Sequence, residues 1–116
     1  MGQPVAMFEI TARDTGKATR FYSELFDWTA QPIGDGYAIV HTGAGEGAIP
    51  GGIGEPPRGD VPRTTVYVPV DDLQACLDKA SELGGSTIVP PTPLPGDAGS
   101  FAVFADPEGT PVGLWA

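Results

Sequence analysis

The chain contains few of the side chains that build disulfides or metal sites. In 116 residues it has one cysteine and one histidine. A single cysteine excludes a disulfide within the chain, and His41 alone cannot provide the imidazoles of a two-histidine metal site in one subunit. Long apolar runs are missing too, since none approaches the roughly 20 residues that cross a bilayer. The sequence therefore predicts no disulfide and no membrane span.

Positive charge is also scarce. Six Lys and Arg residues stand against 15 Asp and Glu, which gives a formal net charge of −9. Because nucleic-acid binding needs cations that neutralise phosphates, we expect no nucleic-acid partner, and a cationic small molecule is favoured. The same acidity also serves simply to keep a protein in solution. Residues 1–4 do not open a signal peptide, so we expect a cytoplasmic protein.

One pattern repeats along the chain at a spacing of 58 residues. A repeat of this length is a supersecondary module, and two modules imply a groove between them. We expect a single domain over residues 1–116, with one module at 4–54, a linker at 55–62 and a second module at 63–116. The matching positions are Pro4 and Pro62, Asp14 and Asp72, residues 23–25 and 81–83, Thr29 and Thr87, and Pro32 and Pro90.

Hydrophobic periodicity predicts the order β-α-β-β-β in the first module. A strand over residues 6–12 precedes a helix that Asp14 caps, and short strands follow near 28–33, 37–41 and 49–53. The apolar residues of the helix are spaced as one helical face. They are Ala18, Phe21, Tyr22, Leu25 and Phe26.

The second module repeats this order. A strand over residues 64–70 precedes a helix that Asp71 or Asp72 caps and that ends at residues 84–85, where two glycines allow the left-handed cap geometry. Strands follow near 86–89, 100–105 and 111–115. The helix positions expected to face inward are Leu73, Cys76, Leu77, Ala80 and Leu83, which makes the thiol buried and inert. The fold class is α+β, with the modules forming a curved, mostly antiparallel mixed sheet around a groove.

Alternation along the opening strand of each module separates its side chains into two faces. The apolar rows that should lie under the helices are Phe8, Ile10 and Ala12, and Val66, Val68 and Val70. The opposite rows, which should line the groove, are Met7, Glu9 and Thr11 in the first module and Thr65, Tyr67 and Pro69 in the second.

Several short motifs occur together in the order that one protein family shows. They are Asp14 with residues 17–22, then 25–28, 70–73, 82–85 and the turn 106–109. On these motifs the chain resembles the vicinal oxygen chelate superfamily, which includes glyoxalase I, extradiol dioxygenases, fosfomycin resistance enzymes and bleomycin resistance proteins. The resemblance covers nearly all of the chain. It implies paired βαβββ modules, a homodimer and, in metal-dependent members, ligands on the first and fourth strand of each module.

Carried onto this chain, those ligand positions fall on Met7, Thr65, Gly113 and either Gly51 or Gly52. Methionine, threonine and glycine do not provide the imidazole, carboxylate or thiolate groups that hold divalent metals in such sites. We therefore expect no metal and no cofactor. This departure also argues against glyoxalase, dioxygenase and fosfomycin-type chemistry.

Glu9 is the main candidate for chemistry because it interrupts an otherwise apolar strand on the side of the groove. A carboxylate there can act as a general acid or base or bind a cationic ligand, whereas on a solvated face it makes only a salt bridge. Tyr67 either donates a hydrogen bond or packs in the core, and Trp115 offers a stacking wall or a dimer seam. The glycine-rich loop 43–47 is interpreted as a lip of the site. The expected ligand-binding residues are Met7, Glu9, Thr65, Tyr67, Gly113 and Trp115, with Glu9 as the catalytic candidate.

Two classes of function follow from the sequence. The first is a metal-independent small-molecule binding protein that acts as a cytoplasmic homodimer. The second is an enzyme, an isomerase, epimerase, lyase or glyoxalase-like protein, that uses Glu9 for proton transfer. A metal-requiring enzyme remains as a third reading if the ligand positions are registered differently.

Overall fold

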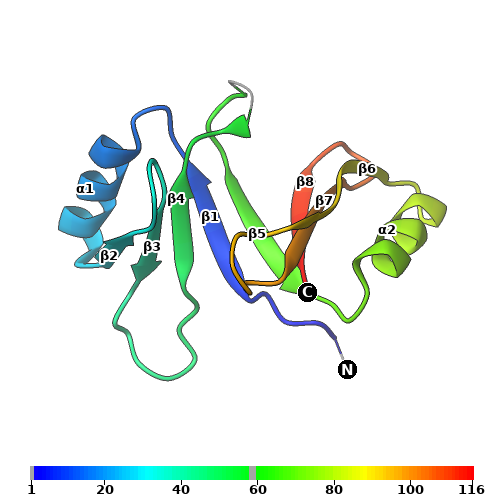
Figure 1. The fold of residues 1–116 in the computed structure, drawn as a ribbon, viewed down its shortest axis with the longest axis horizontal. Coiled ribbons are helices and arrows are strands. Elements are labelled where there is room, and N and C mark those ends of the chain that lie inside the picture. Colours follow the sequence, from blue (N-terminus) through cyan, green and yellow to red (C-terminus); the bar gives the residue numbers. More distant parts are fainter. Residues whose placement is uncertain (1, 58–59) are drawn as a thin grey trace. The chain divides into compact units, whose positions relative to one another are not determined.

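The computed structural model describes residues 2–57 and 60–116. Residues 58–59 of the predicted linker lie outside the described residues. The order βαβββ occurs twice, as expected, and confirms the α+β class (Figure 1). The elements are β1 (Met7–Thr11), α1 (Thr15–Phe26), β2 (Thr29–Pro32), β3 (Ala38–His41), β4 (Gly51–Gly54), β5 (Thr64–Pro69), α2 (Leu73–Glu82), β6 (Ser86–Pro93), β7 (Ser100–Ala105) and β8 (Pro111–Trp115).

Internal contacts divide the chain into two compact units. The first unit is Ala6–Thr65, and the second is Val66–Ala116 together with the segment that ends at Val5. The strand order is β2-β3-β4-β1 in the first unit and β5-β8-β7-β6 in the second. In each unit one pair is parallel, β1 with β4 and β5 with β8, and the other pairs are antiparallel. The predicted mixed, mostly antiparallel pairing is therefore confirmed.

Helix α1 begins where the sequence predicts, and only part of its apolar face packs against the sheet. Asp14 caps it by accepting a hydrogen bond from the backbone N–H of Lys17 at 2.9 Å. None of its residues is fully buried. Its apolar face is only partly covered, because Phe21, Leu25 and Phe26 are 58%, 59% and 52% exposed.

An aromatic cluster explains the orientation of α1. Trp28 lies 5.4 Å from Phe8 of β1 and 6.0 Å from Tyr22 of α1 between ring centroids. The helix therefore packs through its Tyr22 side. Successive helical residues are turned by about 100°, so Phe21 lies at the margin of that side, where it is 58% exposed and meets only the edge of the cluster through Tyr22, at 5.1 Å between ring centroids. The apolar stripe is wider than the contact, and periodicity alone cannot tell which part of it meets the sheet.

Helix α2 covers the core of the second unit. Asp72 is its cap and accepts from the backbone N–H of Ala75 at 3.0 Å. The buried cluster consists of Leu73, Leu77, Ala102 and Leu114, and Val68, Val70, Cys76 and Phe104 pack against it. Two residues predicted to face inward do not, since Leu83 and Val66 are exposed. Leu83 is the C-cap residue beyond the last turn of α2, where the chain leaves the helix.

Strand β6 is longer than the predicted 86–89 and continues to Pro93. Prolines are tolerated there because β6 is the terminal strand of the order in this unit and its pairing with β7 shifts register twice, between Thr87 and Val89 and between Val89 and Thr92. The helix before it ends as predicted, with Gly84 at a φ of 101° and the N–H of Gly85 donating to the carbonyl of Ala80 at 2.8 Å.

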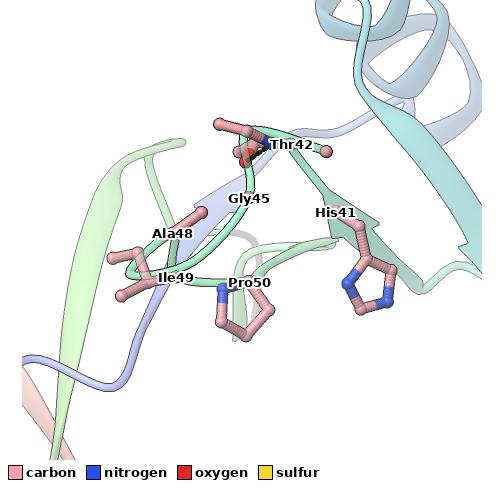
Figure 2. A pocket seen from close by; sticks show the side chains of 8 residues that line it. His41, Thr42, Gly45, Ala48, Ile49 and Pro50 are labelled. Carbon is pink, nitrogen blue, oxygen red and sulfur yellow. Dashed lines mark hydrogen bonds between the residues drawn. The ribbon is translucent and has the colours of Figure 1, made fainter.

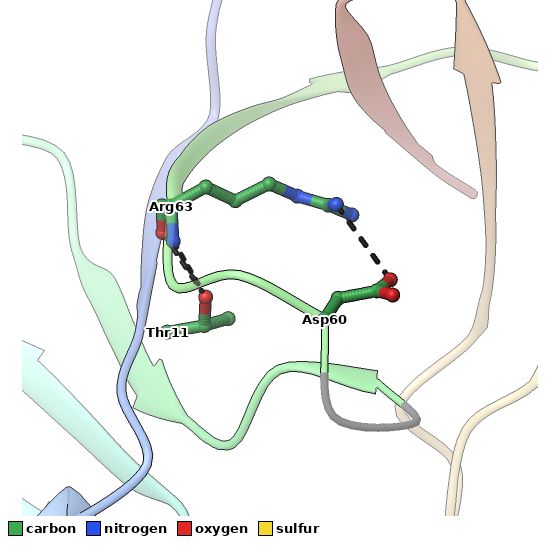
Figure 3. Close-up of polar contacts among 3 residues, drawn as sticks. All are labelled: Thr11, Asp60 and Arg63. Carbon is green, nitrogen blue, oxygen red and sulfur yellow. Dashed lines mark hydrogen bonds and ion pairs between the residues drawn. The ribbon is translucent and has the colours of Figure 1, made fainter.

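Thr11 fastens the chain after the linker to the end of β1 (Figure 3). Its hydroxyl accepts from the backbone N–H of Arg63 at 2.9 Å and donates to the carbonyl of Arg63 at 3.2 Å. The N–H of Thr11 donates to the same carbonyl at 2.9 Å. Thr11 is buried, so this side chain, predicted to line a groove, has a structural task. The Arg63 guanidinium also lies 4.0 Å from Asp60.

Candidate functional site

Glu9 and Tyr37 form the polar centre of the first unit. The parallel register pairs Glu9 of β1 with Gly52 of β4, and the antiparallel register pairs Gly52 with Ile39 of β3. Paired residues of neighbouring strands point to the same face of a sheet. The Tyr37 hydroxyl donates to Glu9 Oε2 at 3.0 Å, and both side chains are half-buried.

Two glycines of β4 make room for the Tyr37 ring. A Cβ added to Gly52 would overlap the Tyr37 hydroxyl, and one added to Gly54 would lie 2.6 Å from its Cδ2. The ring therefore lies across β4 and directs its hydroxyl to Glu9. The sequence reasoning missed Tyr37. The available signal was the alternation of Gly52 and Gly54, which marks a strand face that a large neighbouring side chain covers.

The register also decides between the two glycines proposed as equivalents of Gly113. Glu9 and Tyr67 occupy the same place in the repeat, 58 residues apart. Glu9 pairs with Gly52, and Tyr67 pairs with Gly113. Gly52 is therefore the equivalent position, whereas Gly51 lies beneath the Phe8 ring on the opposite face.

The expected ligand-binding residues divide between the units. Met7 and Glu9 lie on one face of β1, both half-buried, and Thr65 is a buried residue at the end of the first unit. In the second unit the Tyr67 ring lies over Gly113, where a Cβ would overlap it. Trp115 is partly exposed, and its indole N–H donates to the carbonyl of Ala98 at 2.9 Å. The indole is thus bound to the loop before β7.

A pocket of about 390 Å³ lies within the first unit, in the loop between β3 and β4 (Figure 2). Its lining residues are His41, Thr42, Gly43, Ala44, Gly45, Ala48, Ile49 and Pro50. Gly43, Gly45 and Gly47 have φ values of 71°, 92° and 87°, a backbone region that glycine adopts without strain. The predicted lip of the site therefore shapes a pocket of its own.

The pocket is a continuation of the strand face that carries the polar centre. His41 stands two residues after Ile39 on β3, so both side chains point to the face shared with Glu9. Ala48, Ile49 and Pro50 provide apolar surface, and the Thr42 hydroxyl accepts from the N–H of Ala44 at 3.2 Å.

The donor groups at the positions of a superfamily metal site do not fit a divalent cation. Those positions hold Met7, Gly52, Thr65 and Gly113, which offer a thioether, a hydroxyl and two glycines. Across residues 2–57 and 60–116, no three His, Cys, Asp or Glu side chains gather closely enough to hold an ion.

Two βαβββ units, each with a mixed four-strand order and one helix, define the class of protein. Residues 5–114 match the family model of the Glyoxalase/Bleomycin resistance protein/Dioxygenase superfamily, and the chain belongs to that superfamily. Neither α1 nor α2, in the described part of the chain, has the length and hydropathy of a bilayer-spanning helix.

Curated relatives are similar over most of this chain. CFP32 of Mycobacterium bovis, whose name assigns it provisionally to the glyoxylases, is 34% identical over 92% of this chain and 43% of its own length. The anthracycline biosynthesis protein DnrV of Streptomyces peucetius is 30% identical over 95% of this chain and 46% of its own length. The chain thus spans less than half the length of these relatives.

Solved structures share the fold at low identity. The Mn(II)-bound glyoxalase from Novosphingobium aromaticivorans has a TM-score of 0.67 and 15% identity, with 98% of this chain and 40% of that chain covered. Methylmalonyl-CoA epimerase from Mycobacterium tuberculosis has a TM-score of 0.60 and 16% identity, with 96% and 85% covered. These likenesses establish the fold.

Proposed function

We propose that this chain is a metal-independent small-molecule binding protein whose ligand places a cationic group against Glu9 and Tyr37. The observation that carries the proposal is the hydrogen bond from the Tyr37 hydroxyl to Glu9 Oε2. It fixes a carboxylate beside an aromatic ring on one strand face. The formal net charge of −9 favours the same class of ligand.

The chemistry of the pair suits a cation with an apolar body. An ionised carboxylate has about four acceptor sites and accepts several donors at once, which suits an ammonium or guanidinium group beside Glu9. The face of a tyrosine ring attracts a cation as well. The apolar part of the ligand extends toward Ile49 and Pro50 in the neighbouring loop pocket.

A series of probes that differ only in charge tests this function. We expect 3-phenylpropylamine to bind more tightly than 3-phenylpropanol, and 3-phenylpropionate to bind least, in isothermal titration calorimetry. The Glu9→Gln variant should lose about 10- to 100-fold in affinity for the amine, the range of a charge-assisted hydrogen bond, and keep its affinity for the alcohol. Equal affinity of the wild type for all three probes would exclude a cation site at Glu9.

Metal independence is supported by the chemistry of Met7, Gly52, Thr65 and Gly113, none of which is a usual ligand of a divalent metal in proteins. Elemental analysis of protein purified without chelator should find far less than one equivalent of manganese, nickel or zinc. Dialysis against EDTA should leave the affinity for 3-phenylpropylamine unchanged. A stoichiometric metal, or loss of amine binding after EDTA, contradicts the proposal.

The Glu9–Tyr37 hydrogen bond also favours a second candidate, an enzyme that moves a proton without a metal. In it Glu9 removes a proton from the carbon beside a carbonyl group and returns one, the step of an isomerase or epimerase, while Tyr37 orients the carboxylate. Deuterium uptake by hydroxyacetone, followed by NMR, measures this step directly. Glu9→Gln should slow it at least about 100-fold, whereas a pure binding protein gives no exchange above the buffer rate.

We further propose that the protein is a cytoplasmic homodimer. Dimers are usual in the superfamily to which the chain belongs, and this supports the proposal. Sedimentation equilibrium of the purified chain gives the association state.

A further inference from the structure

Helix α1 carries large apolar side chains that remain more than half exposed in the described part of the chain. Phe21 and Leu25 are four residues apart and therefore lie on one side of the helix. Both are more than half exposed. Phe26, one residue further along, is 52% exposed, and its ring also packs against Trp28 at 5.1 Å between centroids. These three side chains, here called the α1 stripe, stand out in a chain with 15 acidic residues. An exposed apolar cluster of this kind usually marks an interaction site.

The charges beside the α1 stripe are distributed against the preference of an isolated helix. The cations Lys17 and Arg20 lie in the first half of α1, and the acids Glu24 and Asp27 lie in the last turn and at the C-cap. The first turn has no acid and the last turn has no base. Acids stabilise a helix at its N-terminus and bases at its C-terminus, so apart from the N-cap Asp14 this arrangement is unfavourable within one copy.

In the part of the chain that the structure describes, none of these four charged residues lies within 4.0 Å of an oppositely charged group. Within residues 2–57 and 60–116, the ion pair present joins the Arg63 guanidinium and the Asp60 carboxylate, 4.0 Å apart. Arg20 precedes Glu24 by four residues, which is the weaker orientation of a helical ion pair. The charge pattern of α1 is therefore unexplained by contacts inside the copy.

An antiparallel copy of the same helix explains both observations. We propose that the α1 stripe of one copy docks on the α1 stripe of a second copy about a two-fold axis, with the helices antiparallel. A two-fold contact uses the same patch on both copies. If Phe21 faces Leu25 of the partner subunit, the basic half of each helix lies beside the acidic half of the other.

This pairing supplies the missing partners. Centred between Phe21 and Leu25, it brings Lys17 and Arg20 within about one helical turn of the acids on the other helix. The two exposed apolar patches are then removed from water together. A single pair of 12-residue helices covers less than the roughly 800 Å² per partner of a standard interface, so we expect a dissociation constant in the micromolar range.

Variants of exposed residues test the surface, and the repeat offers a matched control. Leu25→Asp should weaken dimerisation at least about tenfold in sedimentation equilibrium, because it places a charge in the centre of the contact. Leu83, the repeat equivalent of Leu25 at the end of α2, is also exposed. Leu83→Asp should leave the dissociation constant unchanged. Circular dichroism verifies that both variants keep the wild-type fold.

Charge reversal tests the antiparallel arrangement. The variant K17E/R20E and the variant E24K/D27N should each dimerise more weakly than the wild type, whereas a mixture of the two should form a heterodimer. Dimer affinity that is unchanged in both variants contradicts the arrangement, as does a mixture with no heterodimer.

The α1 contact rests on the proposed homodimer, and different results would exclude the homodimer and the α1 contact. A wild-type chain that stays monomeric at every concentration excludes the homodimer and this surface with it. A wild-type dimer that Leu25→Asp leaves intact keeps the homodimer and excludes α1 as its contact.

Discussion

Glycines of β4 determine which large side chains can cross the sheet of the first unit. Gly51 lies under the Phe8 ring on the side of α1, and Gly52 and Gly54 lie under the Tyr37 ring on the other side. Because successive strand residues point to opposite faces, one short glycine-rich strand accommodates an aromatic ring on each. The position of the Glu9–Tyr37 pair therefore depends on Gly52 and Gly54, which have no side chain that could bind or react with a ligand.

Replacing Gly52 should disturb the polar centre. In Gly52→Ala the new methyl group would overlap the Tyr37 hydroxyl, so the ring must move and its hydrogen bond to Glu9 must lengthen. Overpacking of this kind costs about 1–3 kcal/mol, which urea denaturation measures. Gly16→Ala is the control, since its Cβ would meet only Asp14 Oδ1, at 3.7 Å. Equal stability of both variants would show that Tyr37 is not confined by Gly52.

The Thr11 hydroxyl should contribute more to stability than an ordinary surface hydroxyl. Thr11→Val removes the acceptor for the N–H of Arg63 in a buried place, and an unsatisfied donor there costs about 1–3 kcal/mol. Thr29→Val removes an exposed hydroxyl that lies 3.4 Å from the carbonyl of His41 and should change stability by less than about 0.5 kcal/mol. Thermal denaturation of the two variants compares them, and similar midpoints would contradict the structural task of Thr11.

The candidate site was predictable only in part, for a reason that lies at the scale of single contacts. Glu9 could be selected because a carboxylate in an apolar strand is locally anomalous. Tyr37 could not, because its role depends on Gly52 and Gly54 of a different strand. The same holds for the choice between Gly51 and Gly52, which only the pairing register decides.

At the scale of elements, the two helices are equivalent in the repeat but are held differently. Both begin at an aspartate cap, Asp14 and Asp72. Helix α2 buries Leu73 and Leu77 against the sheet of its unit, whereas α1 has no buried residue and contacts its sheet through half-buried aromatic rings. The order of elements could be predicted from caps, glycines and periodicity. The buried face of α1 could not, because five apolar residues form a stripe wider than the contact.

This difference predicts unequal effects of the same substitution. Leu77→Ala empties a buried position and should destabilise the protein by about 2–5 kcal/mol. Leu25→Ala removes an exposed side chain and should change the unfolding free energy of the monomer by less than about 0.5 kcal/mol. Urea denaturation at a concentration where the chain is monomeric makes the comparison. A large loss in Leu25→Ala would mean that α1 packs through its stripe after all.

At the scale of the whole molecule, like charges repel one another, because 15 acidic residues stand against six basic ones. The formal net charge is −9. Across residues 2–57 and 60–116, the ion pair present joins Arg63 and Asp60 at 4.0 Å, with side chains 33% and 56% exposed, and a pair so exposed contributes little. An acidic chain of this kind repels anions and attracts cations to every part of its surface, so selectivity for one cation must come from a local site.

Salt should therefore stabilise the folded chain. Raising the ionic strength from about 0.01 M to 0.15 M shortens the screening length from about 30 Å to 8 Å, which weakens the repulsion between distant acids more than the contact at Arg63. We expect the thermal midpoint to rise with sodium chloride, whereas glucose at equal osmolality, which leaves charges unscreened, should not reproduce the dependence. A midpoint that falls with salt would mean that attractive ion pairs dominate the electrostatics of the fold.

Salt should also weaken the affinity for 3-phenylpropylamine, because it screens the long-range attraction of the amine to the acidic surface. The loss of affinity caused by Glu9→Gln should persist at high salt, because it reports the local contact with the carboxylate.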